Sequence, residues 1–164
     1  LPDGSGKIYV PTVEFNRDYV LQHIYRHYFG EGIGLRQLLD YYYVLLKGGT
    51  EESKQRTLNL FERTGMTKFV GATMWVLQQV FGMEDQYLLC APHEKAGKQL
   101  LDEVMLAGNF GKYDTRIDKK NHHKLLPRVY NYIKRNIRFV ADYPKEILFE
   151  IPMRTYMYVW KHFI

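Results

Sequence analysis

The sequence predicts an all-α protein, a single bundle of about six to seven helices preceded by a short extended segment. Apolar residues recur at three- and four-residue spacing along most of the chain, which is the helical period. Glycines and prolines interrupt the chain where these stretches end, and strand-like alternation is weak outside the first fifteen residues. Short connections between helices are typical of bundles whose consecutive helices pack together.

The expected helices follow from their start and stop signals. Residues 1–15 are expected to be extended, because Pro11 allows at most an edge strand. Asn16 is a suitable N-cap for the first helix, and Thr50 for the third. The glycines expected to end helices are Gly30, Gly48, Gly65 and Gly82. The expected helices span residues 17–29, 35–47, 51–64, 67–80, 92–106, 122–141 and 153–163.

Large apolar residues at helical spacing predict one core shared by these helices. A domain of about 150 residues buries roughly 68–70% of its unfolded surface, and this chain has 164 residues. Full burial of one large side chain is worth about 1.5–3 kcal/mol. The residues expected in the core are Phe15, Tyr19, Leu38, Leu39, Phe69, Met74, Leu77, Leu101 and Val104.

Cysteine content and hydropathy limit the cellular setting. The single cysteine, Cys90, excludes an intrachain disulfide, is typical of a reducing compartment and is expected to lie in the core. No run of about 18 apolar residues occurs, so we expect a cytoplasmic protein with no membrane partner. The net charge of +5 allows an anionic partner without requiring one.

Polar chemistry is most concentrated at the junction of the first two expected helices. His23 and His27 share one helical face, and so do Arg36 and Asp40. The glycine-rich connection at residues 30–34 is short enough to make the two helices neighbours. We expect at least one contact among the four side chains, in a substrate-binding site where Arg36 grips an anionic group. The alternative is a structural network that sets the angle between the helices.

A metal site at the two histidines is not expected. Two imidazoles four residues apart can face one ion, but zinc needs a third protein ligand. The glutamate of a metalloprotease helix is also absent, because Ile24 stands in its place. In the alternative interpretation, His23 and His27 bond to neighbouring carbonyls or carboxylates.

The strongest basic run begins at residues 119–124 and continues along the sixth expected helix. Arg128, Arg135 and Arg138 fall near one another on one helical face, which makes them candidate anion-binding residues. Such a stripe binds nucleic-acid phosphates with an affinity that falls steeply with salt. A solvated helix face is the alternative. The basic stripe at residues 119–138 thus gives a second functional hypothesis, a nucleic-acid-binding helical module.

Catalytic signatures are absent from the sequence. It contains no G-x-S-x-G, no P-loop, no G-x-G-x-x-G and no C-x-x-C motif. It also lacks an Asp-x-Asp pair, so carboxylates able to hold two catalytic cations have no candidate. We therefore predict no catalytic residue, no metal ligand and no cofactor in this chain.

Several segments of the chain carry a family resemblance. They are Val10-Pro-Thr-Val-Glu-Phe-Asn16, His23-x-x-x-His27, Gly32-Ile-Gly-Leu-Arg-Gln-Leu-Leu-Asp40, Met74-Trp-Val-Leu77, Gly108-Asn-Phe-Gly-Lys-Tyr-Asp114 and residues 135–144. With these segments the chain resembles the region that follows the catalytic domain in a bacterial family of uncharacterised nucleotidyltransferases, themselves similar to the DNA polymerase beta-type superfamily. The resemblance extends over nearly the whole chain.

The resemblance implies an accessory role. In the family a Lys-Gly segment and an Asp-x-Asp motif lie upstream, and this chain has neither. It therefore resembles the substrate-binding helical part, with residues 1–15 as the tail of a missing upstream domain and residues 16–164 as the helical domain. Mg²⁺ and a nucleoside triphosphate are expected for the parent protein only. The implied partners are the upstream domain of the same polypeptide and an acceptor substrate, and this chain alone is expected to be inactive.

Overall fold

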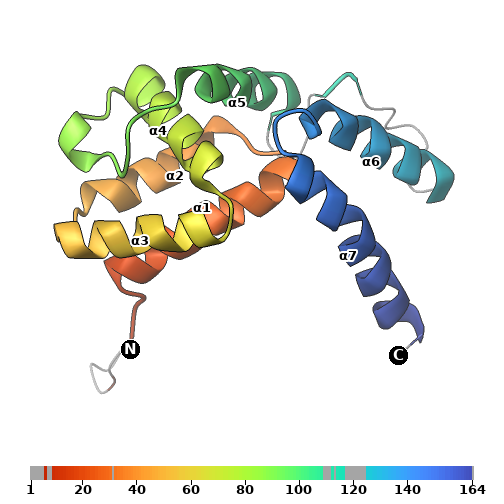
Figure 1. The fold of residues 1–164 in the computed structure, drawn as a ribbon, viewed down its shortest axis with the longest axis horizontal. Coiled ribbons are helices and arrows are strands. Elements are labelled where there is room, and N and C mark those ends of the chain that lie inside the picture. The colour runs from red at the N-terminus through yellow and green to blue at the C-terminus, as the bar shows by residue number, and fades with distance from the viewer. Residues whose placement is uncertain are drawn as a thin grey trace. The chain divides into compact units, whose positions relative to one another are not determined.

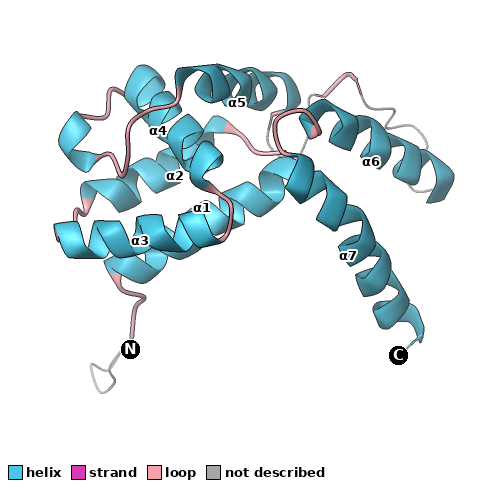
Figure 2. Ribbon diagram, in the orientation of Figure 1, coloured by secondary structure: helices cyan, strands magenta, loops and turns pink. Residues whose placement is uncertain are grey.

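The computed structural model describes residues 6, 9–30, 32–108, 112, 114–116 and 125–163. These residues form helices and no strand, which confirms the predicted all-α fold (Figures 1 and 2). The elements are α1 (Val13–Gly30), α2 (Leu35–Leu46), α3 (Glu51–Arg63), α4 (Thr67–Phe81), the short 3₁₀ turn η1 (Asp85–Tyr87), α5 (Glu94–Ala107), α6 (Leu125–Phe139) and α7 (Pro144–Phe163).

The first helix begins earlier than predicted. Thr12, not Asn16, is the residue that caps α1, because its Oγ1 accepts a hydrogen bond from the backbone N–H of Phe15 at 3.1 Å. The backbone N–H of Asn16 already donates to the carbonyl of Thr12 at 3.0 Å, as it does inside a helix. Both residues are good N-caps, and the one nearer the N-terminus starts the helix. The predicted extended segment therefore ends at Thr12.

The last helix is nine residues longer at its start than the sequence indicated. Pro144 lies between the expected helices 122–141 and 153–163 but is the first residue of α7, where the missing proline N–H leaves no bond unmade. Pro152 lies inside α7 and removes one backbone hydrogen bond without ending the helix. Before it, α6 ends at Phe139, whose carbonyl accepts from the backbone N–H of Tyr143 at 2.7 Å.

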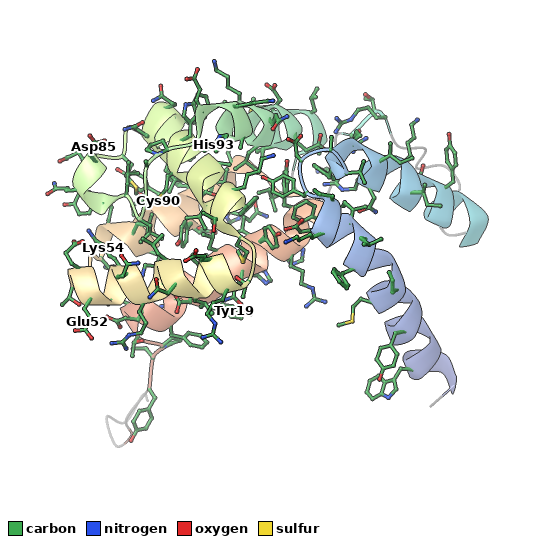
Figure 3. The ribbon with its side chains drawn as sticks, in the orientation of Figure 1. Tyr19, Glu52, Lys54, Asp85, Cys90 and His93 are labelled. Carbon is green, nitrogen blue, oxygen red and sulfur yellow. The ribbon has the colours of Figure 1, made fainter. Side chains whose placement is uncertain are left out.

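The other predicted boundaries are close to those observed. Thr50 caps α3 as expected, because its side chain accepts from the backbone N–H of Ser53 at 3.2 Å. Gly82 ends α4 with φ of 66°, a left-handed conformation that favours glycine. The fifth helix begins after Pro92 instead of at it. His93, labelled in Figure 3, caps α5, and its Nδ1 accepts from the backbone N–H of Ala96 at 3.2 Å.

The chain divides into two compact units, residues 1–113 and 114–164. In the first unit α4 is central, since it packs against α2, α3 and α5. The contact between α4 and α5 is close because Gly97 lies against the ring of Trp75, where a Cβ would come within 2.5 Å. In the second unit α6 packs against α7. None of the described helices combines the length and the hydropathy of a transmembrane segment.

The predicted core is confirmed in α4, confirmed in part in α2 and α5, and wrong at the start of α1. Phe15 and Tyr19 are 55% and 54% exposed. The buried face of α1 instead begins at Arg17. This residue is two positions after Phe15, and two positions correspond to a rotation of about 200° around the helix axis. Leu39 and Leu101 are only half-buried. The predicted core residues that are buried are Leu38, Phe69, Met74, Leu77 and Val104.

Candidate functional site: an arginine cluster around Asp114

Three arginines surround one buried carboxylate in the second unit. Asp114 lies in the turn before α6, and its side chain is fully buried. Its Oδ1 accepts from the backbone N–H of Arg116 at 3.0 Å and from the Nε of Arg116 at 2.8 Å. Its Oδ2 accepts from the Nη2 of Arg116 at 2.9 Å. This is the two-pronged geometry in which a guanidinium group binds a carboxylate most strongly.

Helix α6 supplies the other two guanidinium groups. Arg135 and Arg138 are three residues apart and therefore share a helical face. Their nitrogens lie 3.9 Å and 3.5 Å from Oδ2 of Asp114. The guanidinium group of Arg135 also lies over the ring of Phe139, 5.5 Å from its centroid, in a cation–π contact. The sequence spacing places Arg135 and Arg138 on one face of α6, and both lie near the same carboxylate oxygen of Asp114.

The four side chains of the cluster differ in how far they are exposed to solvent. The side chain of Arg135 is 3% exposed, whereas those of Arg116 and Arg138 are 29% and 23% exposed. Asp114 and Arg135 therefore form the buried base of the cluster. The side chains of Arg116 and Arg138 are partly exposed, so an anion in solvent can reach their guanidinium groups.

The carboxyl group of Asp114 is held in its charged form. Burial favours the neutral acid, but the hydrogen bonds from Arg116 and the charges of Arg116 and Arg138 outweigh burial, so the pKa of Asp114 is lowered. Within the cluster three guanidinium groups face the same carboxylate. Such a site suits a phosphate or carboxylate, which guanidinium groups bind through paired N–H donors.

This cluster contains two of the three predicted anion-binding residues. Arg135 and Arg138 come together as the spacing indicated. Arg128 belongs to α6, but its side chain lies outside what the structure describes, as do residues 119–124 of the basic stripe. Asp114 and Arg116 were not among the predicted site residues. The signal available was an aspartate two residues before an arginine in a loop, an arrangement that allows a local side-chain turn.

The four residues predicted at the junction of α1 and α2 do not form a joint site. The two helices pack together as expected. Arg36 and Asp40 are both exposed, and neither side chain forms a hydrogen bond or ion pair with any residue that the structure describes. Among the described residues, the direct contact within the predicted set is between the rings of His23 and His27, and neither Arg36 nor Asp40 contacts a histidine directly. The physical reason is helix rotation: packing of Leu38 and Tyr41 of α2 into the core turns the Arg36 and Asp40 face outward.

The two histidines belong to an exposed aromatic row on α1. Phe15 stacks on Tyr19 with ring centroids 5.5 Å apart, and Tyr19 stacks on His23 at 5.8 Å. His23 meets His27 edge-on at 4.4 Å. Tyr19, labelled in Figure 3, lies at the surface of the first unit. Spacing of four residues produces this row, and it accounts for the exposure of the two aromatic residues that we expected in the core.

A second polar network, buried between α1 and α3, was not predicted. Arg17 is 1% exposed, and its Nε donates to Oγ1 of Thr57 at 3.0 Å. Its Nη2 donates to the carbonyl and the hydroxyl of Ser53 at 2.7 and 3.1 Å. Thr57 in turn donates to Oδ1 of Asp18 at 2.6 Å, which links the two opposite charges. Because these groups are satisfied by one another and enclosed, we interpret the network as a structural link between the helices.

The thiol of Cys90 is not in an environment that favours a reactive thiolate. It is half-buried, not enclosed in the core as we expected, and burial raises the pKa of its thiol, which disfavours the reactive thiolate (Figure 3). In the described part of the chain, no three His, Cys, Asp or Glu side chains come together in a way that could hold a metal ion.

Comparisons with known proteins leave the function open. No protein-family profile matches the chain, no curated protein matches it, and no solved structure matches its fold. The resemblance to nucleotidyltransferases therefore stays a prediction from the sequence. The arginine cluster has to be interpreted from its own geometry.

Proposed function

We propose that this chain is a helical substrate-binding domain that serves a nucleotidyltransferase and holds the phosphate of an anionic substrate. The observation that carries the anion-binding part is the convergence of Arg116, Arg135 and Arg138 on one buried carboxylate. The nucleotidyltransferase part is supported by the sequence resemblance alone.

The geometry suits binding better than catalysis. Arginine is charged at any accessible pH and cannot exchange protons with a substrate, so the cluster can grip and orient but cannot act as acid or base. Asp114 accepts several hydrogen bonds from guanidinium and backbone groups, which fixes the positions of the cations in advance. Preorganised charge of this kind lowers the ordering cost of binding.

The proposed division of labour leaves metal chemistry to the upstream domain. The described residues bring together no set of ligands for Mg²⁺, so no catalytic step is assigned to this chain. We expect the isolated 164-residue chain to show no metal-dependent nucleotidyl transfer. Its adjacent acidic residues lie next to one another in helices or loops and do not alternate along a strand, so we expect that they do not converge on one ion.

Calorimetric titration of inorganic tripolyphosphate into the full chain tests the proposal. The variants are Arg138→Gln and, as a matched control, Arg56→Gln. Arg56 is an exposed arginine of α3 whose only described ion pair is with Glu52, at 3.1 Å. We expect the wild type and the control to bind equally, and Arg138→Gln to bind about tenfold more weakly.

Two results would contradict this function. Equal binding by Arg138→Gln and wild type would place the anion elsewhere, and an Arg36→Gln variant would show whether it lies at the predicted α1–α2 position. Label transfer from a nucleoside triphosphate by the isolated chain would make the chain itself the enzyme. The alternative, a nucleic-acid-binding module, predicts instead tighter binding of an RNA oligonucleotide, with a steep loss between about 0.05 and 0.2 M salt.

A further inference from the structure

Helix α7 carries a row of large apolar residues that are exposed to solvent, here called the α7 stripe. Phe149, Met153, Tyr156 and Trp160 follow one another at spacings of four, three and four residues, which places them on one face of the helix. Each of them is between 51% and 70% exposed. In Figure 1, α7 meets α6 at the turn between them and diverges from it toward its C-terminal end. An exposed apolar row of this length marks an interaction surface.

Helix α6, the other helix of the second unit, also exposes apolar residues. Asn131 and Arg135 are buried, whereas Tyr130 and Ile137 are 64% and 65% exposed. Over this stretch the usual arrangement, with apolar residues inside and polar residues outside, is reversed. A domain of about 60 residues buries only about 60% of its unfolded surface and is marginally stable, and the second unit is smaller than that. We therefore expect the second unit to gain stability from a partner that covers apolar surface.

The α7 stripe is symmetric about its own midpoint. Its spacings read the same in both directions, so a second α7 that runs antiparallel places Phe149 opposite Trp160 and Met153 opposite Tyr156. Both pairings are favourable, because aromatic rings pack edge-to-face or offset and a methionine sulfur packs well against an aromatic ring. The four side chains carry no charge, so two chains of net charge +5 can meet here without like charges opposite each other. The stripe is therefore complementary to a second copy of itself.

The exposed area of the stripe is sufficient for a specific dimer. A large aromatic side chain buries about 150–250 Å² when it is fully covered, so at the observed exposures the α7 stripe offers roughly 500 Å² per chain. A symmetric pair would bury roughly 1,000 Å², the area from which specific interfaces begin. Leu148, which is 70% exposed beside the stripe, adds to this area. Alternating spacings of three and four residues are also typical of the contact line between two packed helices.

We infer that the α7 stripe is the interface of a symmetric homodimer, in which α7 packs antiparallel against α7 of a second copy of this chain. Phe149 contacts Trp160 of the other copy, and Met153 contacts Tyr156 of the other copy, each twice across the two-fold axis. The inference goes beyond the proposed function and does not depend on it, because no residue of the arginine cluster takes part.

Sedimentation equilibrium of the full chain tests the dimer. The measurement covers about 1 to 100 µM protein, because interfaces of this size dissociate in the micromolar range or below. A reductant excludes disulfide linkage through Cys90. We expect the mass at the highest concentration to be twice that of one chain and to fall toward that of one chain on dilution. A single-chain mass at every concentration would overturn the inference.

Substitutions in the stripe locate the interface. Met153→Lys and Tyr156→Glu are each expected to raise the dissociation constant of the dimer at least about tenfold, because each new charge is taken out of water twice in a symmetric interface. The matched controls are Met105→Lys in α5 and Tyr43→Glu in α2, at residues of similar exposure, 64% and 59%. We expect the controls to dimerise like the wild type. Circular dichroism checks that each variant is folded.

The double variant Met153→Lys/Tyr156→Glu tests the antiparallel direction. In an antiparallel pair each new lysine faces a new glutamate of the other copy, so the double variant is expected to dimerise about tenfold more tightly than either single variant. In a parallel pair like charges would face each other, and the double variant would dimerise more weakly than both single variants. That result would overturn the antiparallel pairing, and a dimer unaffected by either single variant would place the interface elsewhere.

A lipid surface is the other partner that an exposed apolar helix face can take. Cosedimentation of the full chain with vesicles of phosphatidylserine and phosphatidylcholine distinguishes the two. Chains that stay monomeric and bind the vesicles, with binding lost in Met153→Lys and kept in Met105→Lys, would assign the α7 stripe to a membrane surface and overturn the homodimer. Concentration-dependent dimers that are weakened only by the α7 substitutions, with recovery in the double variant, support it.

Discussion

Replacement of Thr57 by valine tests how much the buried polar network between α1 and α3 contributes to stability. The hydroxyl of Thr57 is hydrogen-bonded to both Arg17 and Asp18. Its oxygen accepts from Nε of Arg17 at 3.0 Å and its hydrogen goes to Oδ1 of Asp18 at 2.6 Å. Valine has nearly the same shape, so the substitution removes both hydrogen bonds and creates almost no cavity. Arg17 stays buried with its Nε unsatisfied.

The magnitude follows from the two bonds that are lost. A hydrogen bond to a charged group contributes about 1.5–3 kcal/mol, and leaving the buried partner unsatisfied is what makes the loss expensive. The sum of the two lower limits predicts that Thr57→Val lowers the free energy of unfolding by about 3 kcal/mol. Urea denaturation followed by far-ultraviolet circular dichroism measures this quantity.

The same substitution at Thr73 is a matched control. Thr73 is also buried in a helix, but its Oγ1 has no hydrogen-bond partner among the described residues. Both threonines are β-branched like valine, so helix propensity is nearly unchanged. Thr73→Val is expected to be neutral or to stabilise by about 1 kcal/mol, since it removes a buried unsatisfied hydroxyl. Equal effects of the two substitutions would refute the bridging role of Thr57.

Three further predictions concern stability and metal content. Asp114→Asn lowers the free energy of unfolding by about 3 kcal/mol at neutral pH. Because the pKa of Asp114 is lowered in the folded state, its stabilisation is present above the unfolded pKa of about 3.9 and is lost as the pH falls through the folded value, which urea titrations at several pH values check. Gly97→Ala costs about 1–3 kcal/mol through overlap with the Trp75 ring, measured by thermal unfolding, and an unchanged melting temperature would contradict the close contact. Protein purified without metal affinity is expected to hold no chelator-resistant zinc at His23 and His27, and elemental analysis showing one zinc per chain would overturn this.

Local signals in the sequence predicted most of the helices. Caps and stops act within a few residues, so Thr50 and Gly82 marked real helix ends. Where two equivalent signals compete, as Thr12 and Asn16 do, the sequence does not rank them. The predicted start of the last helix, residue 153, was wrong. Pro144 and Pro152 are both part of α7, because a proline is compatible with a helix when the surrounding residues favour one.

Long-range partners explain what the sequence could not predict. The rotation of α1 depends on Arg17, a charged residue whose burial is made possible by hydrogen bonds to Ser53 and Thr57, 36 and 40 positions away. That rotation decided whether Phe15 and Tyr19 lie in the core. In the same way, spacing placed Arg135 and Arg138 together, but their convergence depends on Asp114, which lies in a loop outside their helix.

Nitrogen–proton NMR spectra of the arginine Nε–H groups test the central claim most directly, since each guanidinium group then reports its own contacts. With inorganic tripolyphosphate titrated into the full chain, we predict saturable shifts for Arg116 and Arg138, and unchanged signals for Arg36 of α2 and Arg56 of α3. Assignment rests on the spectra of the single Arg→Gln variants, each of which lacks one signal. Shifts confined to Arg36, or spread evenly over all exposed arginines, would contradict an anion site at the Asp114 cluster.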